Sequence, residues 1–508
     1  MKKVKYVLIL IISFSLYNQA LAQKKDTFEE QKKAFEKSLE EQNQSFEQTK
    51  SDQGQKYRAF KDKLNDAYGD YLKKTWKKDQ TTPGQPQDNT PKPQETPQDL
   101  TANQPRQEVT LDVIKPQDLP QGNIPENKIP TIEKIPVTPQ NKPAENPLMV
   151  SFSFLDTQFS TPYPDNLHIE LDGEIDFGKI AAYWDAISKK DYLYFVQELM
   201  RRKSEMQLND WAYYALIRSI GIQISGGDQN ECRLFTWFVL NQSGYKARVG
   251  YADNLVYLVV PSRSIIYSKT YYRFNNIPYF VLDAPDNVTL SLNVFEKDYP
   301  DAPNVLDLSI PKPLKISDNV AYRDIKLYYQ GQNYTFKIAY STSAIQLFEN
   351  YPLTDISFFF KAPPSTLAAQ SLKENLSPII AGKSEVEAVR FLLFFVQKAF
   401  EYQTDQVQFN REKVFFIEET LYYPYSDCED RSILFAYLVK ELVGLKVIGL
   451  DYPGHITTAV LFNEDVTGHQ CEYNGKKYLI CDPTYIGADM GRAMDSYKDL
   501  QGKVIDLD

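Results

Sequence analysis

The stretch DCEDRSILFAYLVKELVGLKVIGLDYPGH, residues 427–455, holds one of the four cysteines and one of the three histidines of the 508-residue chain. Apolar residues recur at helical spacing after Cys428 and stop at a glycine, which predicts an amphipathic helix. Ser426 followed by Glu429 matches the pattern of a capping box, so we expect Cys428 in the first turn of that helix. The run LKVIGLD predicts a strand, and His455 is expected to open the next strand.

Two electrostatic effects oppose each other at this cysteine. The N-terminal end of a helix carries a partial positive charge, which favours a thiolate over a thiol. The carboxylates of Asp427, Glu429 and Asp430 disfavour the thiolate, because like charges repel. We therefore expect a nearby imidazolium to supply most of the stabilisation that a reactive thiolate needs. Asp430 itself points about 160° away from Cys428 on helical geometry, and we expect a structural role for it.

A histidine and an aspartate follow in the order that thiol chemistry requires. After His455 a hairpin is expected to turn at Asn474-Gly475, and its return strand KKYLICDPTY carries Asp482. Intervals of 27 residues separate Cys428, His455 and Asp482. Acyl transfer by a thiol needs a nucleophile, an imidazole that moves its proton, and a carboxylate that holds the imidazole tautomer. These three residues are therefore the predicted catalytic set.

The helix-borne DCEDRS, the histidine on the following strand and the DP that closes the next strand resemble the transglutaminase-like superfamily. Among its branches, the bacterial secreted members with a papain-like core are the most similar. The resemblance covers about residues 385–490. It implies that Cys428 is the nucleophile, His455 the general acid and base, and Asp482 the residue that orients the imidazole.

One feature departs from that family. Several members place a tryptophan upstream of the cysteine at the oxyanion hole, whereas the last tryptophan of this chain is Trp237. The backbone amide of Cys428 is a candidate oxyanion donor. The second donor stays unassigned, with Tyr423 and Tyr425 as candidates.

Each of these residues also has a plainer interpretation. Cys428 is alternatively half of a disulfide, as is common outside the cytosol, and His455 is alternatively structural. His469 falls in a polar hairpin and is expected at the surface, and His168 is expected to be structural. No pair of His or Cys residues shows ligand spacing, so we predict no metal site and no cofactor.

Cys471 and Cys481 flank the predicted hairpin. A two-residue turn at Asn474-Gly475 places Cys471 opposite Tyr478 and leaves Cys481 too far away for an undistorted bridge. We therefore predict free thiols rather than a disulfide.

A second segment upstream shows the same order of elements. In DQNECRLFTWFVLNQSGYKARVGYADNLVYLVV and the later PYFVLDAP, a helix with a cysteine ends at a glycine and is followed by strands and an aspartate. Cys232, Asn254 and Asp283 occupy the places of the cysteine, histidine and aspartate in turn. We interpret residues 180–290 as a degenerate second core; chance similarity is the alternative. Without an imidazole, Cys232 is expected to be a buried core residue.

The N-terminus resembles a cleaved secretory signal. A lysine-rich start, an apolar run and small residues at Ala20-Leu21-Ala22 predict a signal peptide at 1–22 and a mature chain that begins at Gln23. A retained membrane anchor is the alternative, although the apolar run is shorter than the ~20 residues that span a bilayer. We expect a periplasmic or secreted protein with no transmembrane segment in the mature chain.

Charge and cysteine content exclude several classes of protein. The formal net charge of -10 and the pI of about 5.2 argue against binding to nucleic acid or, by charge alone, to an anionic membrane. Four cysteines in 508 residues do not form a disulfide scaffold.

We predict an α+β fold with a papain-like, transglutaminase-like core that is duplicated around a β-domain. In that β-domain the run DIKLYYQGQNYTFKIAY predicts a hairpin, and DISFFFKA predicts another strand. The Pro-rich tract is expected to be a semi-extended linker; the alternative for its small apolar clusters, such as EVTLDVI, is that they dock as lone strands. The polar segment before it is expected to be a helix with a narrow apolar stripe. The predicted segments after the signal peptide are a helical segment at 23–78, a linker at 79–148, a degenerate core at 149–290, a β-domain at 291–380 and the intact core at 381–508.

The predicted function is thiol-dependent acyl transfer on peptide amides, by hydrolysis or transamidation, outside the cytoplasm. The alternative is a non-catalytic cell-envelope protein that binds a peptide or protein through papain-like cores. A third interpretation is a structural or assembly protein that reaches a partner through the helix of residues 24–76.

Overall fold

The computed structural model describes residues 37, 52–74, 76–86, 109–110, 112–114, 148–163 and 167–507. The predicted signal peptide and much of the predicted linker lie outside these residues. The chain divides into two compact units, residues 1–63 with 131–143 and residues 64–130 with 144–508. Within the described part, no helix has the length and apolar character needed to cross a membrane. A helix is present at 52–72, inside the predicted helical segment.

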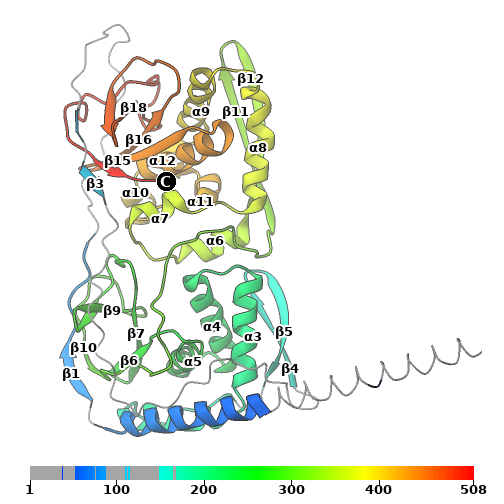
Figure 1. The fold of residues 1–508 in the computed structure, drawn as a ribbon, viewed down its shortest axis with the longest axis vertical. Coiled ribbons are helices and arrows are strands. Elements are labelled where there is room, and N and C mark those ends of the chain that lie inside the picture. The colour runs from blue at the N-terminus through cyan, green and yellow to red at the C-terminus, as the bar shows by residue number, and fades with distance from the viewer. Residues whose placement is uncertain are drawn as a thin grey trace, which may run out of the picture. The chain divides into compact units, whose positions relative to one another are not determined.

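The second unit is a mixed α+β structure, as predicted, and its N-terminal core is built on a six-stranded sheet (Figure 1). The strand order is β1-β10-β6-β7-β9-β8. The strands are β1 (Lys77–Gln80), β6 (Arg248–Ala252), β7 (Leu255–Pro261), β8 (Tyr271–Phe274), β9 (Ile277–Val281) and β10 (Ser291–Val294). The helices are α2 (Phe177–Ser188), α3 (Leu193–Glu205), α4 (Asp210–Ile224) and α5 (Gln229–Gln242), with a separate hairpin of β4 (Leu148–Phe154) and β5 (Thr157–Tyr163).

The C-terminal core is built on a seven-stranded sheet, β2-β17-β18-β16-β15-β19-β3. Its strands are β2 (Val109–Thr110), β3 (Asp112–Ile114), β15 (Lys446–Tyr452), β16 (His455–Leu461), β17 (Gln470–Tyr473), β18 (Lys476–Cys481) and β19 (Lys503–Ile505). Its helices are α9 (Glu385–Ala399), α10 (Asp405–Phe409), α11 (Ile417–Tyr422) and α12 (Cys428–Leu438), continued by the π-helical turn η1 (Val439–Val443). Short strands β13 (Glu401–Tyr402) and β14 (Tyr425–Ser426) pair with each other.

The two sheets share their strand order. Reading from β10 and from β19, the first sheet runs β10-β6-β7-β9-β8 and the second runs β19-β15-β16-β18-β17. Every neighbouring pair in both runs is antiparallel. In each core one helix packs on the central strand of its sheet, α5 on β7 and α12 on β16.

The Pro-rich tract was predicted to be a linker, with docking of EVTLDVI as lone strands as the alternative, and the structure has strands among its described residues. β1 pairs with β10, and Thr82 forms a bridge with Tyr271 of β8 at the other edge of the same sheet. β2 pairs with β17, and β3 pairs with β19, again at opposite edges of one sheet. Backbone pairing at open edges therefore gives these residues a fixed place that their composition does not predict.

The predicted β-domain at 291–380 is also wrong. β10 belongs to the N-terminal sheet, and the only other strands described there are β11 (Val320–Tyr329) and β12 (Gln332–Ser341), which form the predicted hairpin. Three helices follow, α6 (Thr342–Glu349), α7 (Ile356–Lys361) and α8 (Thr366–Ile380). The run DISFFFKA was predicted as a strand but forms α7, because Asp355 caps it and two of its phenylalanines are buried in the core.

Aromatic side chains fill the N-terminal core. Trp184, Trp237 and Tyr68 are fully buried, and the centroids of the two indoles lie 4.7 Å apart. The Tyr68 ring lies 4.7 Å from that of Trp184, and its edge faces the Tyr299 ring at 5.4 Å. Aromatic pairs of this kind add roughly 0.5–1.5 kcal/mol each beyond the area they bury.

Candidate active site

Cys428 is the first residue of α12, as the sequence predicts. The N-cap residue is Asp427 rather than Ser426, and Asp430 at the third position accepts the N–H of Asp427 at 3.1 Å. The capping box is therefore shifted by one residue from the expected Ser426–Glu429 pair. Ser426 instead accepts a hydrogen bond from Arg431 Nε at 3.2 Å.

α12 is a central helix rather than an amphipathic one. All residues from Cys428 to Ala436 are buried. Two hydrogen bonds join its first turns to the start of β16: the N–H of Ile456 donates to Cys428 Sγ at 3.5 Å, and Ser432 Oγ donates to the Ile456 carbonyl at 3.1 Å. These bonds hold the thiol against the backbone of Ile456, the residue that follows His455 in the chain.

His455 and Asp482 form a buried pair. Nε2 of His455 lies 2.9 Å from Asp482 Oδ2, and the two residues are 2% and 3% exposed. The other carboxylate oxygen accepts the N–H groups of Thr484 (2.9 Å) and Tyr485 (3.2 Å). Since an ionised carboxylate can only accept, Nε2 carries a hydrogen, and in the neutral imidazole the lone pair then lies on Nδ1. Nδ1 is buried and has no hydrogen-bond partner among the residues that the structure describes.

An aromatic ring covers the imidazole. The ring of Tyr497 lies over that of His455, with centroids 4.8 Å apart and an interplanar angle of 31°. Tyr497 is itself buried and also contacts Tyr452, which precedes the turn into β16. Tyr497 is not predictable from the sequence, because nothing near it in the chain marks it as part of a site.

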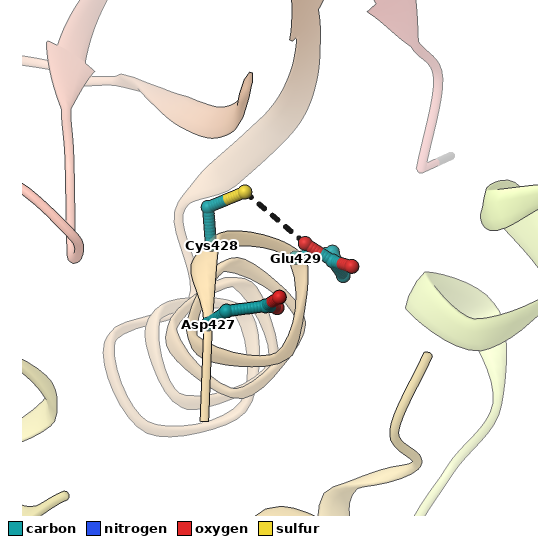
Figure 2. Close-up of side chains that lie close together, drawn as sticks. All are labelled: Asp427, Cys428 and Glu429. Carbon is teal, nitrogen blue, oxygen red and sulfur yellow. Dashed lines mark hydrogen bonds between the residues drawn. The ribbon is translucent and has the colours of Figure 1, made fainter. Parts of the chain in front are cut away.

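The thiol faces a carboxylate (Figure 2). Cys428 Sγ donates to Glu429 Oε2 at 3.1 Å, and the Asp427 carboxylate lies at the same end of α12. Both flanking carboxylates are buried, which strengthens their effect on the sulfur. In this arrangement the thiol carries its proton. The structure thus contains both of the expected effects: a helix end that favours the thiolate and carboxylates that disfavour it.

Further carboxylates lie beside this group. Three sets of residues bring their ligand atoms within 4.8 Å of one another: Asp427, Cys428 and Glu429; Asp405, Asp427 and Asp430; Asp405, Glu412 and Glu429. Carboxylate oxygens are the ligands that hard divalent cations take. Among the described residues, these sets could hold a metal, and spacing rules for pairs of His and Cys do not detect them because their ligands are mostly carboxylates.

Arg431 is a buried cation within the same region. Burial lowers its pKa to about 10, while Asp427, Asp430 and the thiol act in the opposite direction. Its Nη2 donates to the Phe400 carbonyl at 2.7 Å. The guanidinium therefore offsets part of the negative charge at the start of α12.

The remaining candidates have structural contacts. Asp430 accepts the N–H groups of Phe415 (2.9 Å) and Asp427, in agreement with the structural role expected for it. The ring of Tyr423 stacks on Phe415 at 4.8 Å, and Tyr425 lies in β14.

The other two histidines also have structural contacts. His168 Nδ1 lies 3.0 Å from Glu231 Oε1. His469 is half-buried rather than at the surface, and its Nδ1 accepts the N–H of Ala493.

The N-terminal core departs from the expected correspondence at the cysteine. α5 begins at Gln229, so Gln229 stands where Cys428 stands, and Cys232 lies one turn further along the helix. Cys232 Sγ faces the carbonyl of Arg218 on α4 at 3.6 Å. Burial raises the pKa of Cys232 to about 11, as expected for a core thiol.

The histidine position is shifted by one residue as well. Ala252 pairs with Leu255 across a two-residue turn, as Tyr452 pairs with His455. Leu255 therefore stands where His455 stands, and Asn254 lies in the turn at a φ of 62°.

Asp283 and Asp482 follow comparable strand pairs in the two sheets. The N–H of Leu282 donates to the Leu258 carbonyl, and Asp283 comes directly after Leu282. Asp482 likewise comes directly after the last residue of β18 that pairs with β16. Arg218 forms an ion pair with the Asp283 carboxylate, and Arg233 Nε lies 3.5 Å from it.

All four cysteines are free and buried, as predicted for Cys471 and Cys481. Tyr473 pairs with Lys476 and Cys471 with Tyr478, which is the predicted hairpin register. Cys481 pairs with Thr458 of β16, on the opposite side of β18 from β17.

No family model, no curated protein and no solved structure matches the chain. The function is therefore inferred from the chemistry of the site itself.

Proposed function

We propose that the protein catalyses thiol-dependent acyl transfer on peptide amides, with Cys428 as nucleophile, His455 as general acid and base, and Asp482 as the residue that orients the imidazole. The observation that carries this proposal is the buried Asp482–His455 pair, which leaves Nδ1 of His455 as the basic nitrogen. The hydrogen bond from Ile456 to the sulfur supports it, because it joins the thiol to the residue after His455.

The proposed reaction has two stages. Nδ1 of His455 takes the proton of the Cys428 thiol, and the sulfur attacks the amide carbonyl carbon. The C–N bond breaks as His455 returns the proton to the leaving amine, and a thioester remains on the sulfur. Water or a second amine then attacks the thioester, His455 takes its proton, and the acyl group leaves as an acid or a new amide.

The oxyanion of the first stage would form at the start of α12. The first N–H groups of a helix have no intrahelical acceptor as a rule, and they point along the positive end of its dipole. The backbone N–H of Cys428 is the donor we propose there. Such donors act on charge that develops only in the transition state, so they lower the barrier rather than strengthen substrate binding.

We also propose that the catalytic core is transglutaminase-like and that the N-terminal core is a degenerate copy of it. The shared strand order and the equivalent positions of Asp283 and Asp482 support this. The helix of each copy ends at a glycine with positive φ, Gly244 at 85° and Gly444 at 79°. Counted from its first residue to the closing glycine, the helix that ends at Gly444 is one residue longer than the helix that ends at Gly244. The π-helical turn η1 accommodates the extra residue.

The proposed location is outside the cytoplasm, in the periplasm or after secretion, and the proposed substrate is a peptide or protein. The support is the composition of residues 1–22, which has the parts of a cleaved signal.

A second candidate function is peptide or protein binding without turnover. One observation favours it: the Cys428 side chain is 1% exposed and donates to Glu429, so the thiol is neither open nor ionised in this arrangement. Under this proposal both cores would hold a polypeptide, and His455 and Asp482 would be structural.

The two candidates are separated by labelling the full-length protein with iodoacetamide, a thiol-reactive amide. Acyl transfer requires that Cys428 is labelled and that His455→Ala removes the labelling while the protein stays folded. Binding alone predicts labelling of Cys428 that is slow and independent of His455.

A further inference from the structure

Gln397 lies in the last turn of α9, and it is 4% exposed. Its amide nitrogen donates to the backbone carbonyls of Asp482 (3.1 Å), Tyr485 (3.0 Å) and Ala488 (3.1 Å). Its amide oxygen accepts the N–H of Gly487 at 3.2 Å. An amide has two hydrogens to donate, so one of them is shared between two carbonyls. Both ends of this buried side chain are therefore bound to the loop that follows β18.

That loop determines the direction of the Asp482 carboxylate. One oxygen is fixed by the N–H groups of Thr484 and Tyr485, which belong to the loop. The other oxygen faces Nε2 of His455 at 2.9 Å. Any shift of the loop would move the oxygen that holds the imidazole, because the carboxylate turns with its two backbone donors.

The N-terminal core holds the equivalent aspartate in another way. Arg218 of α4 binds the Asp283 carboxylate directly, and Arg233 approaches its other oxygen at 3.5 Å. Two guanidinium groups there neutralise the carboxylate. In the C-terminal core a neutral amide from α9 binds the backbone instead, which leaves the charge of Asp482 for the imidazole.

From these contacts we infer that Gln397 is a positioning residue for the Asp482–His455 pair. It fixes the loop, the loop fixes the carboxylate, and the carboxylate keeps the hydrogen of His455 on Nε2 so that Nδ1 stays basic. This inference rests on the proposed function, since a basic Nδ1 matters only if it takes the proton of a thiol. The plainer reading is that Gln397 anchors a loop and affects stability alone.

The test uses two variants of the full-length protein and one matched control. Gln397→Met has a similar length and no hydrogen bonds, and Gln397→Asn keeps the amide but is too short by one methylene. Gln370→Met is the control, because Gln370 is exposed and its amide donates to Glu374, one turn further along α8.

Two readouts are measured for each protein that shows a cooperative thermal transition. The first is the rate at which iodoacetamide labels Cys428, followed by mass spectrometry. The second is the low-field proton resonance of the His455 Nε2–H, which is assigned by its loss in His455→Gln. A merely structural role for Gln397 would lower the unfolding temperature and leave both readouts in place.

We expect both Gln397 variants to lose or broaden the low-field resonance and to be labelled on the order of 100-fold more slowly, the size of effect that a misplacement of about 1 Å produces. The control should match the wild type. A folded Gln397→Met with an unchanged resonance and labelling rate would overturn the inference; if that variant does not fold, unchanged values in Gln397→Asn overturn it.

Failure of the proposed function gives a different result. In that case Cys428 of the wild type is not labelled in a His455-dependent way, while the resonance still reports whether Gln397 holds the pair.

Discussion

Replacing Asp482 by asparagine should remove the chemistry and leave the fold in place. The asparagine oxygen can still accept the N–H groups of Thr484 and Tyr485, which now bind Asp482 Oδ1. Its NH2 group then faces Nε2 of His455, where a carboxylate oxygen stood at 2.9 Å. Since an NH2 group donates, Nε2 must become the acceptor and the hydrogen must move to Nδ1. The nitrogen that should take the thiol proton is then blocked.

The expected magnitudes follow from these contacts. All three hydrogen bonds to the carboxylate become bonds to a neutral group, at a loss of about 1 kcal/mol each, so the loss of stability should not exceed about 3 kcal/mol. The loss of rate should be on the order of 10⁴-fold, as for the wrong tautomer in a triad. Asp482→Ala is the contrasting variant, because it leaves three buried donors without an acceptor and should destabilise the protein by roughly 3 kcal/mol or more.

The assay is the rate of iodoacetamide labelling of Cys428 at near-neutral pH, with chemical denaturation to measure stability. A folded Asp482→Asn protein that is labelled within about twofold of the wild-type rate would refute the role assigned to the carboxylate.

Three further changes test other parts of the account. Glu429→Gln removes the carboxylate that accepts a hydrogen bond from the Cys428 thiol, so the rate of Cys428 labelling at mildly acidic pH should rise at least about tenfold. An unchanged rate would show that this contact does not keep the thiol neutral. Burial raises the pKa of Cys232 to about 11, above the value of about 8.5 for an unfolded thiol, so its contribution to stability is full below about pH 8.5 and is lost as the pH rises through 11. Cys232→Val should therefore flatten the alkaline limb of the unfolding free energy, and identical pH profiles would contradict the burial of this thiol. The register opposes residue 109 to Cys471, so Val109→Cys should form an intramolecular disulfide under mild oxidation, whereas Thr110→Cys should not; equal cross-linking of the two would contradict the placement of β2.

Local signals predicted much of the C-terminal core. Capping residues and helical spacing placed the start of α12 to within a residue or two, and the Asn474-Gly475 turn gave the β17–β18 register. Turn chemistry and periodicity act over a few residues, so one sequence is enough to detect them. His455 opens one predicted strand and Asp482 closes a later one, and this placement led to the prediction that the two side chains pair.

Features that depend on distant contacts were missed or misplaced. α7 was predicted as a strand, because its phenylalanines have strand propensity and only tertiary packing makes them helical. The edge strands β1, β2 and β3 lie in a Pro-rich tract whose composition predicts no structure. Gln397 has no local signature, since its partners follow it by 85 to 91 residues.

The correspondence between the two cores was displaced for a similar reason. Cys232 and Asn254 were aligned by residue type, whereas helix starts and strand register align Gln229 and Leu255 with Cys428 and His455. Register is set by backbone pairing, which a comparison of letters does not contain.

The central claim is tested most directly by the pH dependence of cysteine labelling in the full-length protein. Iodoacetamide is applied from pH 5 to 9, and mass spectrometry follows each of the four cysteines. If a His455-paired thiolate exists, Cys428 is labelled at mildly acidic pH while Cys232, Cys471 and Cys481 are not, and His455→Ala abolishes that selectivity in a folded protein. Labelling of Cys428 that rises with pH in parallel with the other three cysteines would contradict the account.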